Sequence, residues 1–263
     1  MFKQAGSLIR VFRHQLKISP SLSSLIHTLP TLANQSQYEA QGIPGFLSPN
    51  AFKQGWTDYQ NYLLENLTQL TMDSENESRV PFHIVLNTSA KPDQAHVFNY
   101  ASQAHNNHMF FQALRSASEN TTKPSAPLLE RINKSFGSME SLRAQMLTDA
   151  DTLLGNGWVF LVEGEDKMLY TMATFNAGTP YDLSRSQMFD LNSAVGQDTW
   201  NTLNQIEKAV YGKEKNHSIV LLALNVWEHI YVPDYSVSGR ADYLEKWWDS
   251  IDWDVVSSRL FVR

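Results

Sequence analysis

The sequence of 263 residues contains no cysteine. Disulfide bonds, thiolate metal sites and cysteine nucleophiles are therefore excluded, although this absence does not indicate a cellular compartment. No apolar run approaches the roughly 20 residues that a membrane-spanning helix needs, so we expect no membrane partner. Glycine-rich phosphate-binding motifs, the nucleophile elbow and the His-Glu-x-x-His helix are also missing. The composition is that of a globular protein, and nothing in it suggests a small-molecule substrate.

Acidic residues are absent from the first 38 positions, which carry Lys3, Arg10, Arg13 and Lys17 among apolar side chains. This pattern is typical of an amphipathic mitochondrial targeting segment, and we predict a targeting or basic N-terminal segment over residues 1–38. The alternative is a basic arm that stays on the protein and contacts an anionic partner. The rest of the chain is acidic, and the whole chain has a net charge of −6. Because phosphate contacts need clustered cations, we predict at most limited contact with RNA.

Hydrophobic spacing predicts two long helices in the first half of the chain. Ser48 offers an N-cap and Pro49 a first helical position, and apolar residues then recur at helical spacing from 51 to about 70. After a polar run and a short apolar piece at 82–86, a second helix is predicted from about 93 to 115. The two helices predict an antiparallel hairpin domain over 39–116, followed by a Ser-, Thr-, Asn- and Pro-rich linker at 117–127.

The second half, 128–263, mixes helices with short apolar strands and is expected to form an α/β domain. A helical stretch is predicted at 128–154, strands at 158–162, 168–175 and 219–227, and two closing helices at 243–251 and 254–261. The expected fold class is therefore α+β. It consists of an N-terminal helical hairpin and a C-terminal domain with a three-stranded antiparallel sheet.

Five short motifs occur in order along this pattern. They are His-Asn-Asn-His-Met-Phe-Phe at 105–111, Leu-Gly-Asn-Gly-Trp at 154–158, Asn-Ala-Gly-Thr-Pro at 176–180, Leu-Asn-Val-Trp-Glu-His-Ile-Tyr at 224–231 and Ile-Asp-Trp-Asp-Val-Val at 251–256. Together they resemble the iron/manganese superoxide dismutase family from about residue 46 to 261. The resemblance implies the fold of that family, which has the same order of hairpin, helix, three strands and closing helices.

That family binds its metal through three histidines and one aspartate, and the resemblance places only part of this set in the present chain. His108 and His229 match two of the histidines, but Asn225 stands at the aspartate. The predicted first helix contains no histidine, and Gln54 or Gly55 lies nearest the missing ligand. A neutral amide cannot supply the anionic oxygen that balances a redox-active cation. We therefore predict no catalysis and no cofactor, with His108, Asn225 and His229 as vestigial positions.

The glutamine that bonds metal-bound solvent in the family is also missing, because its two possible places are Ala104 and Ala177. His105 has no ligand counterpart in the family and is predicted to be an ordinary polar helix residue. His108 and His229 are predicted to be core histidines whose ring nitrogens bond each other, Asn225 or a buried water.

The glutamate of the Trp-Glu-His segment bonds a histidine of the neighbouring subunit in that family. By this resemblance Glu228, His229 and Tyr231 are predicted to be interface residues. The tyrosine that normally follows is Val232 here, which implies an altered interface.

One group with this fold, the structural proteins of the fungal mitochondrial small ribosomal subunit, resembles the chain further. The shared segments are Gly-Ile-Pro-Gly-Phe-Leu-Ser at 42–48, the His-Asn-Asn-His segment and Phe-Asp-Leu-Asn-Ser-Ala at 189–194. The group implies a location in the mitochondrial matrix and a heterodimer with a paralogue of the same fold. Other small-subunit ribosomal proteins are then the expected partners, with limited rRNA contact. Two alternatives remain: a mitochondrial superoxide dismutase with a rearranged metal site, and a free mitochondrial pseudoenzyme that binds another protein.

Overall fold

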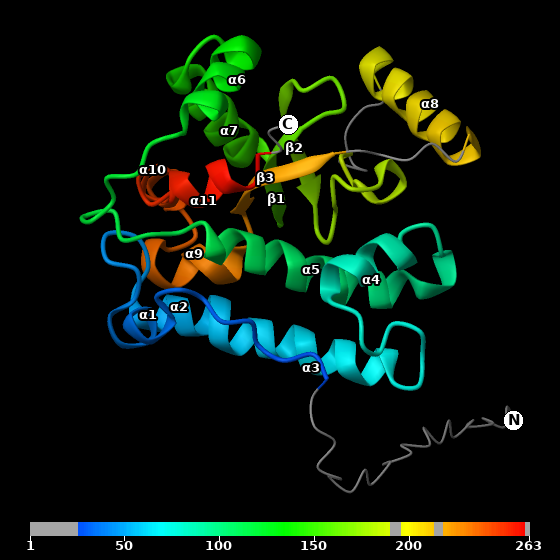
Figure 1. The fold of residues 1–263 in the computed structure, drawn as a ribbon, viewed down its shortest axis with the longest axis horizontal. Helices are drawn as coiled ribbons and strands as arrows, with labels where there is room; N and C mark the ends of the chain where they lie inside the picture. The colour runs from blue at the N-terminus through cyan, green and yellow to red at the C-terminus, as the bar shows by residue number, and fades with distance from the viewer. Residues whose placement is uncertain (1–25, 190–195, 213–217, 261–263) are drawn as a thin grey trace, which may run out of the picture.

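The computed structural model describes residues 26–189, 196–212 and 218–260 (Figure 1). Helices dominate the N-terminal half, in the order α1 (Gln35–Gln41), α2 (Pro49–Phe52), the π-helical turn η1 (Lys53–Asp58), α3 (Tyr59–Thr71), α4 (Pro81–Thr88), the 3-10 turn η2 (Pro92–Gln94) and α5 (Ala95–Gln112). The C-terminal half contains α6 (Ala126–Phe136), α7 (Met139–Thr152), β1 (Gly157–Glu163), β2 (Leu169–Phe175), the 3-10 turn η3 (Leu183–Arg185), α8 (Gln197–Gly212), β3 (Ile219–Asn225), α9 (Glu228–Tyr235), α10 (Arg240–Asp249) and α11 (Trp253–Ser258).

The first predicted helix is confirmed as one continuous rod made of α2, η1 and α3. Its start is fixed by Ser48, whose side chain accepts a hydrogen bond from the Ala51 N–H at 3.2 Å, and by Pro49 in the first turn. Within this continuous helix, the segment after Phe52 has π-helical hydrogen bonding. Because a π turn closes i→i+5 bonds, it shifts the helical period and therefore changes which residues face inward beyond it.

The second predicted helix is confirmed as α5, and it packs beside α3 to form the hairpin (Figure 1). The short apolar piece before it is part of helix α4, which covers the outer end of α5. Leu67, Ile84 and Phe98 are buried where these three helices meet.

The single helix predicted at 128–154 is wrong, because the chain forms two helices there. Gly137 has a φ of 86° at the end of α6, a left-handed conformation that favours glycine and stops the helix. Ser138 then begins α7, and its side chain accepts a hydrogen bond from the Ser141 N–H at 3.1 Å. The break lets both helices pack toward the sheet.

The predicted three-stranded antiparallel sheet is confirmed, with the strand order β2-β1-β3. Phe160 of the central strand pairs with Met172 on one side and Ala223 on the other. Every residue of β1 is buried, as expected for a strand with a neighbour on both sides and helices on its faces. The α+β class predicted from the sequence is therefore correct.

The third strand ends two residues earlier than predicted, at Asn225. The Asn225 side chain accepts a hydrogen bond from the Trp227 N–H at 2.8 Å, and this side-chain turn leads directly into α9. Neither α9 nor α8 was predicted from hydrophobic spacing. The two closing helices are confirmed as α10 and α11, with shifted bounds.

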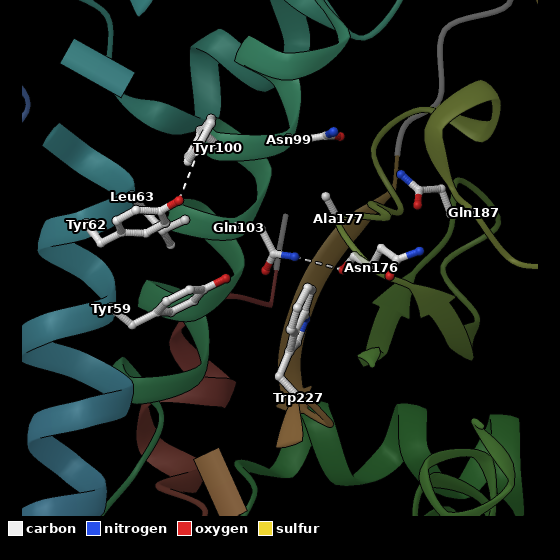
Figure 2. Close-up of a pocket in the computed structure, with 10 residues that line it drawn as sticks. All are labelled: Tyr59, Tyr62, Leu63, Asn99, Tyr100, Gln103, Asn176, Ala177, Gln187 and Trp227. Atoms are coloured by element: carbon white, nitrogen blue, oxygen red, sulfur yellow. Dashed lines mark hydrogen bonds between the residues drawn. The ribbon is translucent and has the colours of Figure 1, made fainter. Parts of the chain in front are cut away.

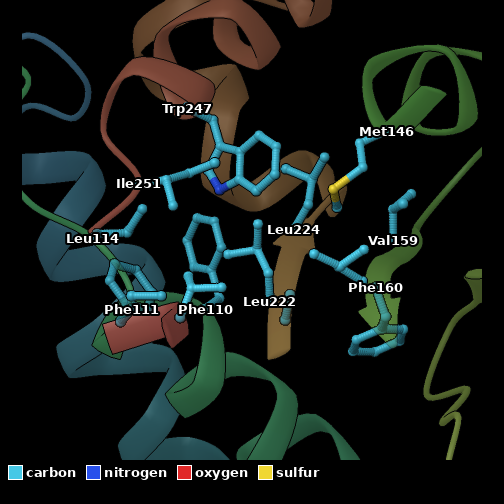
Figure 3. Packing of buried hydrophobic residues seen from close by; sticks show 14 of the residues in the cluster. Phe110, Phe111, Leu114, Met146, Val159, Phe160, Leu222, Leu224, Trp247 and Ile251 are labelled. Atoms are coloured by element: carbon cyan, nitrogen blue, oxygen red, sulfur yellow. The ribbon is translucent and has the colours of Figure 1, made fainter. Parts of the chain in front are cut away.

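The two halves are joined by polar contacts between α5 and the loop after β2. Ser102 and Asn106 donate to the carbonyls of Ala177 and Gly178 at 2.8 and 3.1 Å, and Gln103 donates to the Asn176 carbonyl at 3.0 Å (Figure 2). The same helix also contributes to the main apolar core. Figure 3 shows that Phe110 points toward side chains of β3 and α10, and the labelled residues of this contact are Phe110, Leu222, Leu224 and Trp247.

The predicted segment 1–38 lies largely outside the described residues, since the structure describes it only from residue 26. In the described part, Leu32 and Tyr38 are buried on the hairpin. Tyr38 packs edge-on against Phe52 at 5.6 Å and donates to the Leu114 carbonyl at 3.2 Å. The boundaries at 38, 116 and 127 stay predictions. No helix in the described part of the chain is long and apolar enough to cross a bilayer.

Candidate functional site

Asn225 lies fully buried at the end of β3, opposite Trp158 of β1. Its side-chain oxygen accepts from the Trp227 N–H at 2.8 Å, and its amide nitrogen donates to the side-chain oxygen of Asn107 at 3.4 Å. The position that carries an aspartate ligand in the resembling enzymes is therefore occupied by a neutral side chain whose oxygen and nitrogen are both bonded.

The polar contacts continue from Asn107 as a chain of three neutral amides, which we call the amide cluster: Gln60, Asn107 and Asn225. The Asn107 amide nitrogen donates to the Gly55 carbonyl at 3.0 Å and to the side-chain oxygen of Gln60 at 2.9 Å. Gln60 in turn donates to the Ala104 carbonyl at 2.9 Å. All three side chains are buried, so the cluster satisfies itself without an ion.

Gly55 is the inward position of the first helix at this site, and Gln54 is not. Gln54 is exposed and donates to the His229 carbonyl at 3.3 Å, whereas Gly55 is buried. A Cβ atom added to Gly55 would lie 2.2 Å from Cδ1 of Ile230 and 3.3 Å from Cζ of Phe111. Ile230, itself fully buried, therefore fills the volume that a side chain at residue 55 would need.

His108 is not hydrogen-bonded to the amide cluster and lines a pocket instead. Its ring packs on Trp56 with centroids 5.8 Å apart, and it lines a pocket of about 380 Å³ together with His27 and His105. Burial, followed by the nearby charge of Arg259, lowers the pKa of His108. Its imidazole is therefore neutral at pH 7.

His105 lies on the same pocket and contacts Tyr181, whose hydroxyl is 2.9 Å from its Nε2. Burial lowers the pKa of His105 to about 3, with smaller effects from His108 and Arg259. His105 is a half-buried imidazole with a hydrogen-bond partner, whereas the sequence suggested an ordinary polar helix residue.

His229 packs between aromatic rings at the start of α9. Its ring lies 4.3 Å from Tyr59 and 5.8 Å from Trp227, measured between centroids. Its Nε2 is buried without a hydrogen-bond partner among the described residues, and burial lowers its pKa to about 4. This nitrogen therefore bonds neither His108 nor Asn225, and the third predicted partner, a buried water, stays a prediction.

The two places for a solvent-binding glutamine, Ala104 and Ala177, are both buried alanines. A glutamine does lie one residue before Ala104, at Gln103, but both its side-chain oxygen and its nitrogen are hydrogen-bonded. It accepts from the Trp158 indole N–H at 3.2 Å and donates to the Asn176 carbonyl at 3.0 Å. Sequence reasoning missed Gln60, Gln103 and Asn107. The signal that was available is the unusual number of amide residues beside the His-Asn-Asn-His motif.

A second pocket of about 380 Å³ opens between α3, α5 and the loop after β2, and Figure 2 shows its aromatic wall. Tyr59, Tyr62, Tyr100 and Trp227 surround it, and burial raises the pKa of Tyr59. Phenols and amides of this kind offer neither an ionised base nor a nucleophile at neutral pH. The pocket is a surface hollow without an acid–base pair.

A metal of the kind that the resembling enzymes use does not fit the residues present. The described residues contain no group of three or more His, Asp or Glu side chains that could hold a metal ion. The amide cluster offers no anionic oxygen, and Ile230 fills the space beside Gly55, one of the two positions predicted to lie nearest the missing ligand.

The three predicted interface residues differ in their accessibility. Glu228 is exposed at the first turn of α9, where its N–H donates to the Asn156 side chain at 3.0 Å. His229 is half-buried, and Tyr231 is 2% exposed, its hydroxyl accepting from Arg240 at 3.2 Å. In the single chain, only Glu228 presents its side chain to a partner. The interface role of all three stays a prediction.

The fold and this site define a class of protein: a helical hairpin joined to a three-stranded α/β domain, with a buried amide cluster between them. The family model described as "Iron/manganese superoxide dismutases, C-terminal domain" matches residues 124–202 and 193–259. The chain belongs to this family.

Individual relatives fall into two kinds. The small ribosomal subunit protein mS43 of Schizosaccharomyces pombe is 30% identical over 240 residues, which is 89% of this chain and 84% of that protein. The small ribosomal subunit protein mS42 of the same organism is 30% identical over 83% of this chain and 90% of that protein. The iron superoxide dismutase of Legionella pneumophila is 28% identical over 89% of this chain and 98% of that enzyme.

Proposed function

We propose that this chain is a structural, non-catalytic component of the mitochondrial small ribosomal subunit. The observation that carries the proposal is the amide cluster of Gln60, Asn107 and Asn225, in which the residue predicted to replace the aspartate ligand is fully hydrogen-bonded to neutral groups. The similarity to mS43 and mS42 over more than four fifths of the chain supports the same role. The protein then works in the mitochondrial matrix, as part of the ribosome.

The rival function is a superoxide dismutase with a rearranged site. Such a site needs a carboxylate or further histidines close to His108 or His229. His108 shares its pocket with His27 and His105, but the described residues contain no group of three or more His, Asp or Glu side chains that could hold a metal ion. His229 lies between the rings of Tyr59 and Trp227. The donor set therefore favours the structural role.

A surface suited to a paralogue of the same fold lies around Glu228. Leu154 is 82% exposed and Val237 is 79% exposed, the largest values among the described large apolar side chains. Hydrogen bonds join the loop that contains Leu154 to the region of α9 and Val237. Arg240 donates to the carbonyls of Leu153 and Gly155, and the Glu228 N–H donates to the Asn156 side chain. We name Leu154, Glu228 and Val237 the α9 face. Exposed apolar side chains beside a lone carboxylate are typical of a protein interface.

Charge limits the contact with rRNA. The chain has 21 lysines and arginines against 27 aspartates and glutamates, whereas phosphate binding needs clustered cations. Protein contacts, with limited rRNA contact, would then hold the protein in the subunit. The basic residues of the predicted 1–38 segment act in import or in such a contact.

Sedimentation of a mitochondrial lysate on a sucrose gradient tests the proposal. We expect this protein to migrate with small-subunit rRNA, and we expect those fractions to contain no iron or manganese stoichiometric with it. A slowly sedimenting peak with bound metal and dismutase activity would favour the enzyme, and a slow peak without metal would favour the free pseudoenzyme.

Leu154→Asp should separate the heterodimer without unfolding the chain. The side chain is solvated in the single chain, so the free energy of unfolding should change by no more than about 0.5 kcal/mol. At an interface the new carboxylate would be desolvated, and the dissociation constant of the pair should rise by about 30-fold or more. Leu86→Asp, at an exposed leucine of α4, is the matched control. Analytical ultracentrifugation of each variant co-expressed with its partner measures the two dissociation constants. Equal values for Leu154→Asp and Leu86→Asp would show that the α9 face is not the interface.

A further inference from the structure

Helix α8 lies at the periphery of the molecule, apart from α9 and from the hairpin (Figure 1). It packs chiefly against the short turn η3 among the described elements. The family model matches the chain in two stretches that meet at 193–202, where α8 begins. This helix therefore stands where the chain departs from the continuous pattern of its family.

Two apolar side chains of α8 are exposed. Thr199, Thr202 and Ile206 are half-buried on its inner side, whereas Trp200 is 56% exposed and Leu203 is 37% exposed. A helix that only covers its own core turns its apolar stripe inward. Trp200 and Leu203 are three residues apart and hence adjacent on the outer surface, so α8 presents an apolar stripe to something outside this chain.

We propose that α8 docks through Trp200 and Leu203 into an apolar groove on a neighbouring protein of the small ribosomal subunit. This inference rests on the proposed ribosomal function and adds a second contact, separate from the α9 face. An exposed tryptophan with an aliphatic neighbour one turn away is the usual anchor of a helix that binds in a groove.

The charges of α8 indicate a protein and not rRNA as the occupant. The sequence of residues 197–212 contains two acidic residues and a single lysine, Lys208, which lies beside the exposed Glu207. Contact with a phosphate backbone requires several clustered lysines or arginines, and carboxylates oppose it. An apolar groove has no such requirement, since burial of the indole and the leucine side chain supplies the attraction.

The test compares Trp200→Ala/Leu203→Ala with the matched control Gln205→Ala/Lys208→Ala, which removes two exposed polar side chains from the same helix. Each variant replaces the natural protein in cells, and the fraction that sediments with small-subunit rRNA is measured at increasing salt. We expect the apolar variant to be retained about tenfold less or worse, with unchanged melting temperature and unchanged heterodimer, and the control to behave as the wild type. Equal retention of both variants would overturn the proposal.

A photoreactive phenylalanine derivative at position 200 identifies what covers the helix. In purified small subunits we expect its crosslink to join another protein, whereas a crosslink to rRNA, or none, would contradict the protein groove. The two hypotheses fail differently. If the wild-type protein does not sediment with the subunit, the ribosomal function itself is wrong; if it does and the apolar variant sediments equally well, only the role of α8 is wrong.

Discussion

Gly55→His is expected to lower the free energy of unfolding by about 3 kcal/mol or more. The Cβ atom alone would lie 2.2 Å from Cδ1 of Ile230, and the imidazole would need further space beside Phe111 in a closely packed core. A histidine therefore cannot be placed at residue 55 without a movement of Ile230. Urea unfolding followed by circular dichroism measures the loss.

Ile230→Ala should relieve most of this penalty, although by itself it costs about 2–5 kcal/mol because it leaves a cavity. In the double variant the imidazole would occupy that cavity, so the two losses should be far from additive. Gln54→His is the control, because Gln54 is exposed and its replacement should change the stability by about 0.5 kcal/mol at most. Additive losses at Gly55 and Ile230 would show that Ile230 does not fill the ligand's place.

The same geometry bears on attempts to rebuild the metal site. Asn225→Asp replaces the amide that donates to Asn107 by a carboxylate that can only accept, and so leaves two oxygen atoms facing each other. We expect the variant with Asn225→Asp and Gly55→His to bind metal weakly or not at all, since the surrounding amides still point inward. Full loading with manganese in metal analysis would show that the surrounding residues still suit a metal.

Acidification from pH 7 to 4 is expected to destabilise the fold by about 3–5 kcal/mol through its buried histidines. Burial lowers the pKa of His105 to about 3 and that of His229 to about 4, against an ordinary value of 6.5. In the unfolded chain these imidazoles become protonated near pH 6.5, whereas in the folded chain they stay neutral until a lower pH. The stabilisation is therefore complete above pH 6.5 and is lost as the pH falls toward 4 for His229 and toward 3 for His105.

The slope of unfolding free energy against pH, taken from urea curves between pH 7 and 4, measures this effect. His229→Phe keeps an aromatic ring between Tyr59 and Trp227 and should reduce the slope by up to one proton in this range. His96→Phe, at an exposed histidine of α5, is the matched control for the replacement of a histidine by phenylalanine. A slope that is equally steep in wild type and His229→Phe would assign the acid sensitivity to other groups.

The order of elements could be predicted because it depends on local patterns. Ser48 and Pro49 mark the start of the first helix, and the apolar residues of β1 mark a central strand. The predictions failed where one residue redirects the chain. Gly137 splits a predicted helix, and Asn225 bonds the Trp227 N–H and starts α9. These are single conformational choices that hydrophobic spacing does not contain.

By itself, the sequence determined the family, the α+β class and the two broken ligand positions, Asn225 and the first helix without histidine. Only the tertiary structure decided that Gly55 rather than Gln54 faces inward, because the π-helical turn at Lys53–Asp58 shifts the helical period at that point. The tertiary structure also decided what fills the centre. The hydrogen-bonded partners Asn107 and Asn225 are 118 residues apart in the sequence, and Gln60 lies on another helix. Only tertiary packing brings these amides together.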